Sequence, residues 1–379
     1  MRIGLYNPRV GTYATGGTET FLREMARQLS RDHTVVVYTG GGEIVPELHE
    51  LEVQTRAIPF TSEGTRVSDV TTGLTPLHSH EVESLTMYWN ARRQGLYKRM
   101  ASEVDVISTH SLLDNALISG RVPVPVVFRV AGIRNGSIRW RWLLRWDRST
   151  LRLANSEATA DRLLRWLDTD TDGTVYAGLD LNQFSPDGSE VARPDAPLVL
   201  YLGRLDEGKG LFDLLDAVAN LRDKIDLRLR VVGDGDLRAD LETRASSLGI
   251  ADAVEFIGTV PHSKVQEYYR AADVYCLPSY SEGFPLGNIE AMACKTPVVS
   301  TDIAAVREQI TNSETGLLVE PGDVAALEKE LERLLADSDL RSELAERAYE
   351  WVQHLSWSQQ ASELCEYYQE AINTDTNTL

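Results

Sequence analysis

Short apolar runs rich in β-branched residues alternate with amphipathic stretches along this chain of 379 residues. The runs resemble buried strands, and the stretches between them carry apolar residues at helical spacing. Apolar strands separated by helices indicate a parallel sheet that is covered by helices on both faces. In the first half we expect strands at 3–7, 34–38, 104–109, 124–130 and 153–156, and helices at 18–29, 84–101 and 157–167.

The alternation stops in a turn-rich, weakly apolar segment at 182–197 and then restarts. We therefore predict an α/β protein with two tandem Rossmann-like domains, whose parallel sheets face a central cleft. The domains are expected at 1–190 and 191–354, and an amphipathic C-terminal helix within 355–379 is expected to pack back on the first domain. In the second half we expect strands at 198–202, 227–232, 254–258, 274–277 and 298–300, and helices at 211–221, 237–248, 263–271 and 286–293.

Composition excludes several classes of protein. The net charge of −19 argues against nucleic-acid binding, because phosphate contacts need a basic face. Three widely spaced cysteines, Cys276, Cys294 and Cys365, exclude a disulfide scaffold and a cysteine-based zinc site. No apolar stretch reaches the roughly 18 residues of a membrane span, and residues 1–6 lack the apolar core of a signal peptide. We expect a cytoplasmic protein.

The turn at 203–210 follows an expected strand and precedes an expected helix. It contains two cations, Arg204 and Lys209, in a glycine-rich setting that suits a phosphate group. The spacing also matches part of an ATPase P-loop, but Gly210 stands where that loop needs a Ser or Thr hydroxyl for magnesium. We reject the ATPase interpretation on that ground. An ordinary turn with two surface cations remains the alternative.

A second glycine turn, Gly16-Gly17, joins the first expected strand to the first expected helix. Glycines there allow a close backbone approach to an anion, although a simple flexible turn explains them equally well. The turn lacks the G-x-G-x-x-G fingerprint of nicotinamide cofactors, which disfavours an oxidoreductase.

Two carboxylates follow the strand expected at 274–277. Glu282 lies in a Gly/Pro turn, and Glu290 lies eight residues later in an apolar helical context. A carboxylate in such a context needs hydrogen bonds, and vicinal sugar hydroxyls could supply them. The pair could also be the acid and base of a hydrolase, or a helix cap and a partly buried structural glutamate.

His110 ends the strand expected at 104–109. Its place at the carboxyl end of a strand favours a functional role about as strongly as a structural one. The other histidines show no metal-ligand spacing, and the acidic run at 168–172 is typical of a solvated turn.

The segment 134–152 combines arginines with tryptophans and carries a net charge of +5. Amphipathic rings and cations together suit the surface of an anionic membrane. The alternative is a surface helix whose tryptophans belong to the core, and RNA binding is a weaker third possibility. The candidate membrane or acceptor residues are Arg139, Trp140, Arg141, Trp142, Arg145 and Trp146.

Taken in order along the chain, these segments resemble glycosyltransferase family 4, retaining enzymes of the GT-B fold. The resemblance covers nearly the whole chain and is most specific at 198–322. Besides the turns described above, it includes the loop at 231–237, the stretch Thr296-Pro297-Val298-Val299, Glu308 and the stretch 316–319. Glu282 and Glu290 match the Glu-x7-Glu signature of that family.

The resemblance implies a UDP- or GDP-sugar as co-substrate, with no further cofactor and no metal. Arg204 and Lys209 would hold the donor diphosphate, and Glu290 would bind the ribose. Glu282 would bind the transferred sugar, and His110 would contact that sugar near the reaction centre. Glu308 is a further donor contact that the resemblance suggests.

Backbone groups complete the implied donor site. Gly16 and Gly17 would approach the diphosphate from the first domain. Amides near 284–287 would face the cleft, which adds Gly283, Phe284, Pro285 and Leu286 to the donor-binding residues.

One departure from the family pattern is Lys295, which stands where a glycine commonly ends the helix. A lysine in the left-handed cap conformation costs roughly 1 kcal/mol.

The resemblance leaves the acceptor open. Our first hypothesis is a transferase that acts on a lipid-linked or cell-envelope glycan, with peripheral contact at the inner face of the cell membrane. The alternatives are a soluble transferase that forms a small-molecule glycoside, and a non-catalytic sugar-nucleotide-binding module.

Overall fold

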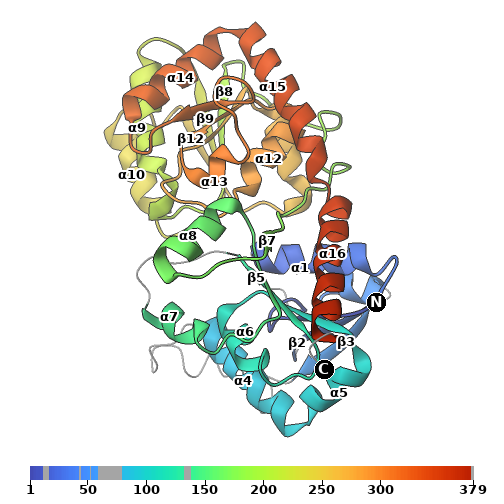
Figure 1. The fold of residues 1–379 in the computed structure, drawn as a ribbon. Coiled ribbons are helices and arrows are strands. Elements are labelled where there is room, and N and C mark those ends of the chain that lie inside the picture. The colour runs from blue at the N-terminus through green and yellow to red at the C-terminus, as the bar shows by residue number, and fades with distance from the viewer. Residues whose placement is uncertain (12–16, 42–43, 52, 59–78, 132–137, 377–379) are drawn as a thin grey trace. The chain divides into compact units, whose positions relative to one another are not determined.

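The computed structural model describes residues 1–11, 17–41, 44–51, 53–58, 79–131 and 138–376, and it divides into two compact units (Figure 1). Unit 1 comprises Met1–Gly178 and Trp357–Leu379, and unit 2 comprises Leu179–Ser356. The first boundary thus lies earlier than the expected 190/191. The reason is that the turn-rich segment folds onto unit 2, where Phe184 is buried and Arg270 donates to the Ser185 carbonyl at 3.0 Å.

Unit 1 is built on a seven-stranded sheet in the order β3-β2-β1-β4-β5-β6-β7, in which every neighbouring pair is parallel. The order reverses between β1 and β4, whose carboxyl ends are where open sheets of this kind bind ligands. The strands are β1 (Arg2–Tyr6), β2 (Thr34–Gly40), β3 (Gln54–Ile58), β4 (Val106–Thr109), β5 (Val126–Val130), β6 (Leu151–Ala154) and β7 (Gly173–Thr174).

Helices cover both faces of this sheet. Side chains of α1 (Gly17–Leu29), α2 (Pro46–Glu50) and α16 (Trp357–Thr376) share one core cluster with β1 and β2. A second cluster joins α4 (Ser79–Arg93), α5 (Leu96–Glu103) and α6 (Leu112–Ile118) to the other face, and α7 (Ile138–Leu144) and α8 (Glu157–Leu167) contribute to a third. The single helix expected at 84–101 is two helices, because the chain turns at Gly95 with φ +65°.

Unit 2 repeats the arrangement with a six-stranded parallel sheet in the order β10-β9-β8-β11-β12-β13. Its strands are β8 (Leu198–Leu202), β9 (Arg228–Val232), β10 (Val254–Gly258), β11 (Val274–Leu277), β12 (Val298–Thr301) and β13 (Leu317–Val319). Its helices are η1 (Glu207–Lys209), α9 (Leu211–Arg222), α10 (Arg238–Ser247), η2 (His262–Lys264), α11 (Val265–Ala271), α12 (Leu286–Ala293), α13 (Ala304–Arg307), α14 (Val324–Ala336), α15 (Ser338–Val352) and η3 (Gln353–Leu355).

The left-handed conformation expected at Lys295 is confirmed, since its φ is +56° directly after the C-cap of α12. Two contacts with α15 offset the backbone cost. The Lys295 ammonium lies 2.5 Å from a carboxylate oxygen of Glu346 and 4.7 Å from the centre of the Tyr349 ring. The side chain therefore compensates where a glycine would have fitted without strain.

Candidate active site

The candidate donor site of unit 2 lies where its strand order reverses. β8 has β9 on one side and β11 on the other, so the loops that leave β8 and β11 start side by side at the carboxyl edge of the sheet. The first loop carries Arg204 and Lys209, and the second carries Glu282 and leads into α12 with Glu290. Ligands of doubly wound sheets bind at such an edge.

The two loops meet through an ion pair between Lys209 and Glu282. The Lys209 Nζ lies 2.6 Å from Oε1 of Glu282, and the side chains are only 18% and 12% exposed. The backbone adds a second tie, because the Tyr280 amide donates to the Gly208 carbonyl at 2.9 Å. The structure therefore brings together two predicted residues that are far apart in the sequence.

Gly210 makes this approach of the loops possible. Its φ of +65° is in the left-handed region, and a Cβ at this position would lie 2.0 Å from the Pro278 carbonyl oxygen. The residue precedes α9 directly and follows Lys209, so its conformation sets where the ammonium group is held. Only glycine combines this conformation with this contact.

Arg204 is the exposed member of the site. Its side chain is 80% exposed and lies 3.0 Å from Asp206, so the guanidinium faces solvent. The backbone beneath it is fixed, because the Tyr201 hydroxyl donates to the Arg204 carbonyl at 2.7 Å. Gly233, from the glycine loop after β9, packs so closely that a Cβ would lie 1.9 Å from the Gly203 carbonyl oxygen. A solvent-facing cation on a fixed backbone can bind an anion without rearranging the loop.

Glu290 is a buried carboxylate with a donor at each oxygen. The Tyr269 hydroxyl donates to Oε2 at 2.9 Å, and His262 Nε2 lies 3.3 Å from Oε1. Burial, with the charge of Glu290 as a further cause, raises the pKa of Tyr269 well above its ordinary value, so this hydroxyl stays a donor. Glu290 therefore has the hydrogen bonds that we expected for a carboxylate in an apolar context.

Buried tyrosines connect the parts of this site. The rings of Tyr269 and Tyr275 pack edge to face at 5.3 Å. Burial raises the pKa of Tyr275, and the charges of Glu290 and Glu282 raise it further, so both carboxylates act on one hydroxyl. Tyr275 therefore lies close enough to Glu282 and Glu290 to be affected by the charge of both.

The residues 283–286 form the entry to α12. Gly283, Phe284 and Leu286 are partly exposed, and Pro285 is buried at the N-cap, where its carbonyl accepts from Gln309 at 3.1 Å. Within the described structure, no side chain caps the first amides of this helix. These amides and the positive end of the helix add to the charge of Lys209 nearby.

His110 follows β4 of unit 1 and is 5% exposed. Its Nε2 lies 3.0 Å from the Ser108 hydroxyl, whereas its buried Nδ1 has no partner among the described residues. Burial and the nearby charge of Arg129 lower the pKa of His110 well below its ordinary value. The imidazole is therefore neutral.

The glycine turn of unit 1 is described only in part. Gly16 lies outside the described residues, and Gly17 is the first residue of α1 and is exposed. Among the described residues, nothing lies within 4 Å of the position that a Cβ at Gly17 would take.

The Arg/Trp segment is partly buried and partly exposed. Trp140 is partly buried against the cluster of Phe128 and Leu163, as the core alternative expected, whereas Trp142 and Trp146 are 58% and 52% exposed. The two exposed rings lie 6.1 Å apart. The side chain of Arg139 lies outside the described residues, and Arg141 is exposed with a hydrogen bond to the Trp166 carbonyl.

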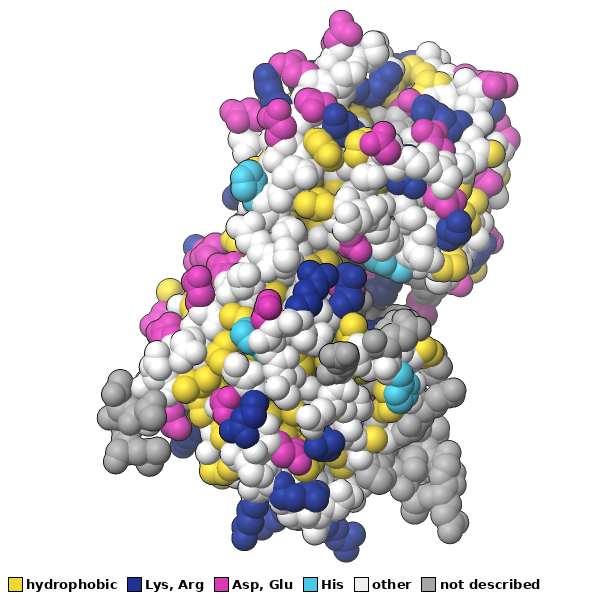
Figure 2. Space-filling model, turned by 90° about the vertical axis from the view of Figure 1, so that its right-hand side faces the viewer, with side chains coloured by type: hydrophobic (Ala, Val, Ile, Leu, Met, Phe, Trp, Pro, Cys, Tyr) yellow, Lys and Arg dark blue, Asp and Glu magenta, His cyan; other side chains and the backbone are white. Residues whose placement is uncertain are grey.

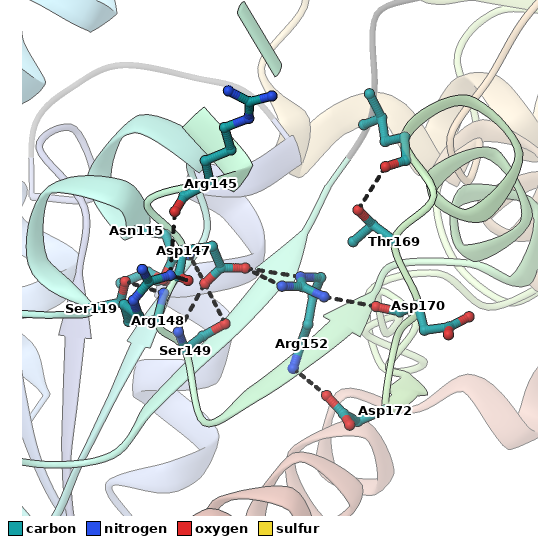
Figure 3. A network of polar contacts seen from close by, with 12 residues as sticks. Asn115, Ser119, Arg145, Asp147, Arg148, Ser149, Arg152, Thr169, Asp170 and Asp172 are labelled. Carbon is teal, nitrogen blue, oxygen red and sulfur yellow. Dashed lines mark hydrogen bonds and ion pairs between the residues drawn. The ribbon is translucent and has the colours of Figure 1, made fainter. Parts of the chain in front are cut away.

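Arg148 and Arg152 belong to a polar network around the buried Asp147 (Figure 3). Asp147 accepts from Asn115 at 2.7 Å, from Ser149 and from the Arg152 guanidinium. Burial opposes ionisation, but the contacts with Ser149 and Arg152 outweigh it and lower the pKa of Asp147. The Arg145 guanidinium points away from this network (Figure 3).

Acidic and basic side chains are interspersed on the face of unit 2 drawn in Figure 2, and basic side chains also lie on unit 1, where helices α4 and α5 carry several. Exposed residues of those helices include Arg92, Arg93, Lys98 and Arg99. Among the described residues, no helix combines the length and apolar character needed to cross a bilayer. Nor does that part of the chain gather three or more His, Cys, Asp or Glu side chains that could hold a metal ion.

Sequence reasoning missed His262 and Tyr269, the partners of Glu290. A weak signal for His262 was available, because it lies in the loop that follows the carboxyl end of β10. Tyr269 lies within α11 and is fully buried, so its position in the sequence is typical of a core residue. Glu308 ends α13 and is partly exposed.

Two family models match the chain. The model of glycosyl transferases group 1 matches residues 187–351, and the model of glycosyltransferase family 4 matches residues 15–183. A D-inositol 3-phosphate glycosyltransferase from Corynebacterium kroppenstedtii is 31% identical over 352 residues, which cover 86% of this chain and 74% of that protein. A protein of the same name from Streptomyces bingchenggensis is 34% identical over 239 residues, but that match spans only 52% of its length.

Solved structures share the fold. A sucrose-phosphate synthase from Thermosynechococcus elongatus has a TM-score of 0.79 at 22% identity, covering 97% of this chain and 98% of that one. The Anabaena protein HepE, solved in complex with UDP and glucose, has a TM-score of 0.76 at 18% identity, covering 98% of this chain and 100% of that one.

Proposed function

Because the chain belongs to glycosyltransferase family 4 and has the GT-B fold, we propose that it transfers a sugar from a nucleotide-sugar donor to a hydroxyl acceptor with retention at the anomeric carbon. The observation that carries this proposal is the meeting of Lys209 with Glu282 at 2.6 Å at the sheet edge. A cation and a carboxylate side by side suit a substrate that offers a phosphate next to a sugar hydroxyl. UDP is the favoured nucleotide, since HepE was solved with it.

In the proposed reaction, one bond to the anomeric carbon breaks and another forms. The bond between the anomeric carbon and the diphosphate oxygen breaks, and its electron pair leaves with the diphosphate. The acceptor oxygen bonds to the same face of the sugar, and its proton passes to the leaving phosphate. Arg204, Lys209 and the start of α12 stabilise the charge on the leaving group, a preorganised effect on the order of several kcal/mol. Glu282 of unit 2 would hold the sugar, and His110 of unit 1 is proposed separately as a sugar contact.

The donor site is tested by removing one group at a time. Glu290→Gln and Arg204→Ala are expected to abolish donor turnover while the melting temperature stays close to that of the wild type. Arg347→Ala is the matched control, because Arg347 is an exposed arginine of α15 that forms an ion pair with Glu343. Normal turnover in both site variants would refute the proposal.

A thermal-shift screen with UDP, GDP and ADP sugars identifies the nucleotide, since binding to the native state raises its melting temperature.

We propose that turnover needs no added metal, because two side-chain cations and a helix terminus supply the positive charge. Dialysis against EDTA is then expected to leave the rate unchanged. A rate that falls with EDTA and returns with magnesium would contradict this.

For the acceptor, the names of the relatives favour a small phosphorylated polyol such as inositol 3-phosphate. A radiolabelled donor assay with inositol phosphates tests this directly. Hydrolysis of the donor without transfer to any of them would argue against this class of acceptor.

A lipid-linked or envelope-glycan acceptor is the second candidate, and the exposed pair Trp142 and Trp146 favours it. Aromatic rings beside arginines bind at the headgroup level of anionic bilayers. In flotation with phosphatidylglycerol vesicles, the double variant Trp142→Ser, Trp146→Ser should lose binding. Trp89→Ser is the matched control, because Trp89 is 57% exposed on α4. Wild-type protein that ignores these vesicles would refute this candidate.

A further inference from the structure

The segment that enters unit 2 packs beneath the partners of Glu290. Phe184 is 2% exposed, and its ring lies edge-on to His262 at 5.6 Å and to Tyr269 at 6.3 Å. The neighbouring Gln183 donates from Nε2 to the His262 carbonyl at 2.8 Å. Both the ring and the backbone of His262 are thus held by residues 183–184.

The two oxygens of Glu290 differ in their surroundings. Oε2 accepts from Tyr269, whose side chain is fully buried and whose backbone carbonyl is itself bound by Thr296 at 2.7 Å. Oε1 lies 3.3 Å from Nε2 of His262, a side chain that is 60% exposed. Of these two described neighbours of Glu290, His262 is the one that faces solvent, so the Oε1 side is the more accessible to a ligand.

The contact with His262 uses only part of the hydrogen-bond accepting capacity of Oε1 of Glu290. An ionised carboxylate has about four acceptor positions, so Oε1 can accept a further hydrogen bond from a ligand hydroxyl. What His262 fixes is the direction of the carboxylate. A glutamate that is already held in one rotamer binds a pair of hydroxyls without losing further side-chain freedom.

We propose that His262 is a positioning residue for Glu290, which it orients toward the vicinal hydroxyls of the donor ribose, and that Phe184 and Gln183 set the place of His262. The inference rests on the proposed function, because it takes the ribose diol as the ligand of Glu290. It assigns to the turn-rich start of unit 2 a share in donor binding that its sequence does not suggest.

The test measures donor KM and kcat together with UDP affinity by calorimetry. His262→Ala should raise the donor KM about 3- to 10-fold with kcat within about twofold, because the ribose is remote from the reacting bond. His262→Gln should restore most of the affinity, since its amide nitrogen can donate to Oε1. Phe184→Leu, which keeps the apolar volume but removes the ring, should give a smaller rise in KM.

The controls separate this inference from the proposed function. His33→Ala changes a histidine of unit 1 and should leave KM unchanged, and His262→Ala should keep the wild-type melting temperature because the side chain is largely exposed. Wild-type turnover with an unchanged KM in His262→Ala, or a lower kcat at constant KM, would overturn the inference alone. Wild-type protein that binds no nucleotide sugar would overturn the proposed function and this inference with it.

Discussion

Asp114 is a fully buried carboxyl group in the first turn of α6, beside the hydroxyls of Ser84 and Ser111. Burial raises its pKa from 3.8 to about 7, and the two hydroxyls only partly oppose this. In the unfolded chain the group ionises at its ordinary value. Between about pH 4 and pH 7 the folded state therefore holds a proton that the unfolded state has lost, and the free energy of unfolding falls as the pH rises through this window.

Asp114→Asn should remove this pH dependence. We compare the free energy of unfolding of the variant with that of the wild type at each pH. This difference should shift in favour of the variant by on the order of 2–4 kcal/mol between pH 4 and pH 8, because the amide stays neutral throughout. Urea unfolding at a series of pH values measures the effect. Asp161→Asn, an exposed aspartate of α8, is the control and should follow the wild type. A wild-type profile that is flat between pH 4 and pH 7 would contradict the assignment.

Arg129 is a second buried charge in unit 1. Burial lowers its pKa to about 9, so the guanidinium remains charged at neutral pH. It lies 3.8 Å from the centre of the Phe21 ring and donates to the Val175 carbonyl at 2.8 Å, and Phe21 also packs against His110. This cation helps to keep His110 neutral.

Arg129→Met should raise the pKa of His110 toward its ordinary value, although burial will keep it lower. Nuclear magnetic resonance titration of the His110 ring measures the change directly. In the same variant, the acid limb of the plot of donor turnover against pH should move to higher pH. The reason is that a protonated His110 ring cannot accept a hydrogen bond. A His110 titration that is identical in both proteins would show that burial alone sets the pKa.

Among the elements of the site, the turn from η1 into α9 depends most strongly on one backbone conformation. Gly210→Ala should destabilise unit 2 by at least about 2 kcal/mol, because the methyl group would collide with the Pro278 carbonyl in a left-handed turn. Donor turnover should be lost as well, since Lys209 would shift. Gly208→Ala is the control within the same turn, because the nearest atom to its Cβ would be 3.7 Å away. Equal stability of the two variants, measured by denaturant unfolding, would contradict this account.

Several elements could be predicted from the sequence because local signals bound them. The helix 157–167 was expected at its observed limits, and the Ser156 side chain caps it by accepting from the Thr159 amide. The strands 198–202, 254–258 and 274–277 were likewise apolar runs between turns. By contrast, β3 has the sequence Gln-Thr-Arg-Ala-Ile at the edge of its sheet, so no apolar run marks it.

Individual residues of the candidate site could be predicted from the sequence, but their arrangement in space could not. Glycine turns and strand ends pointed to Lys209, Glu282 and His110. The ion pair between Lys209 and Glu282 depends on β8 and β11 being neighbours, and the order of strands in a sheet is a tertiary property. The partners of Glu290 were missed for the same reason, since they come from the loop after β10 and from α11.

At the scale of the whole molecule, unit 1 is discontinuous in sequence. The chain leaves it after Gly178 and returns at Trp357, and the two crossings lie together, since Leu179 pairs with Ser356. The returning helix α16 contributes Leu364 and Tyr368 to the core of unit 1.

Leu364→Ala should destabilise unit 1 by about 2–4 kcal/mol through the cavity it leaves, while unit 2 keeps its stability. Hydrogen exchange read separately for the two units measures this. Leu331→Ala, a fully buried leucine of α14, is the reciprocal control and should weaken unit 2 alone. Equal loss of protection in both units after either change would show that they unfold as one.

The late return of α16 has a consequence for synthesis on the ribosome. Unit 2 is one uninterrupted stretch and can fold once it has emerged from the exit tunnel. Unit 1, although made first, must wait with one apolar sheet face incomplete until the last helix is released. During that interval we expect the nascent unit 1 to expose apolar surface of the kind that molecular chaperones bind, until α16 has been synthesised.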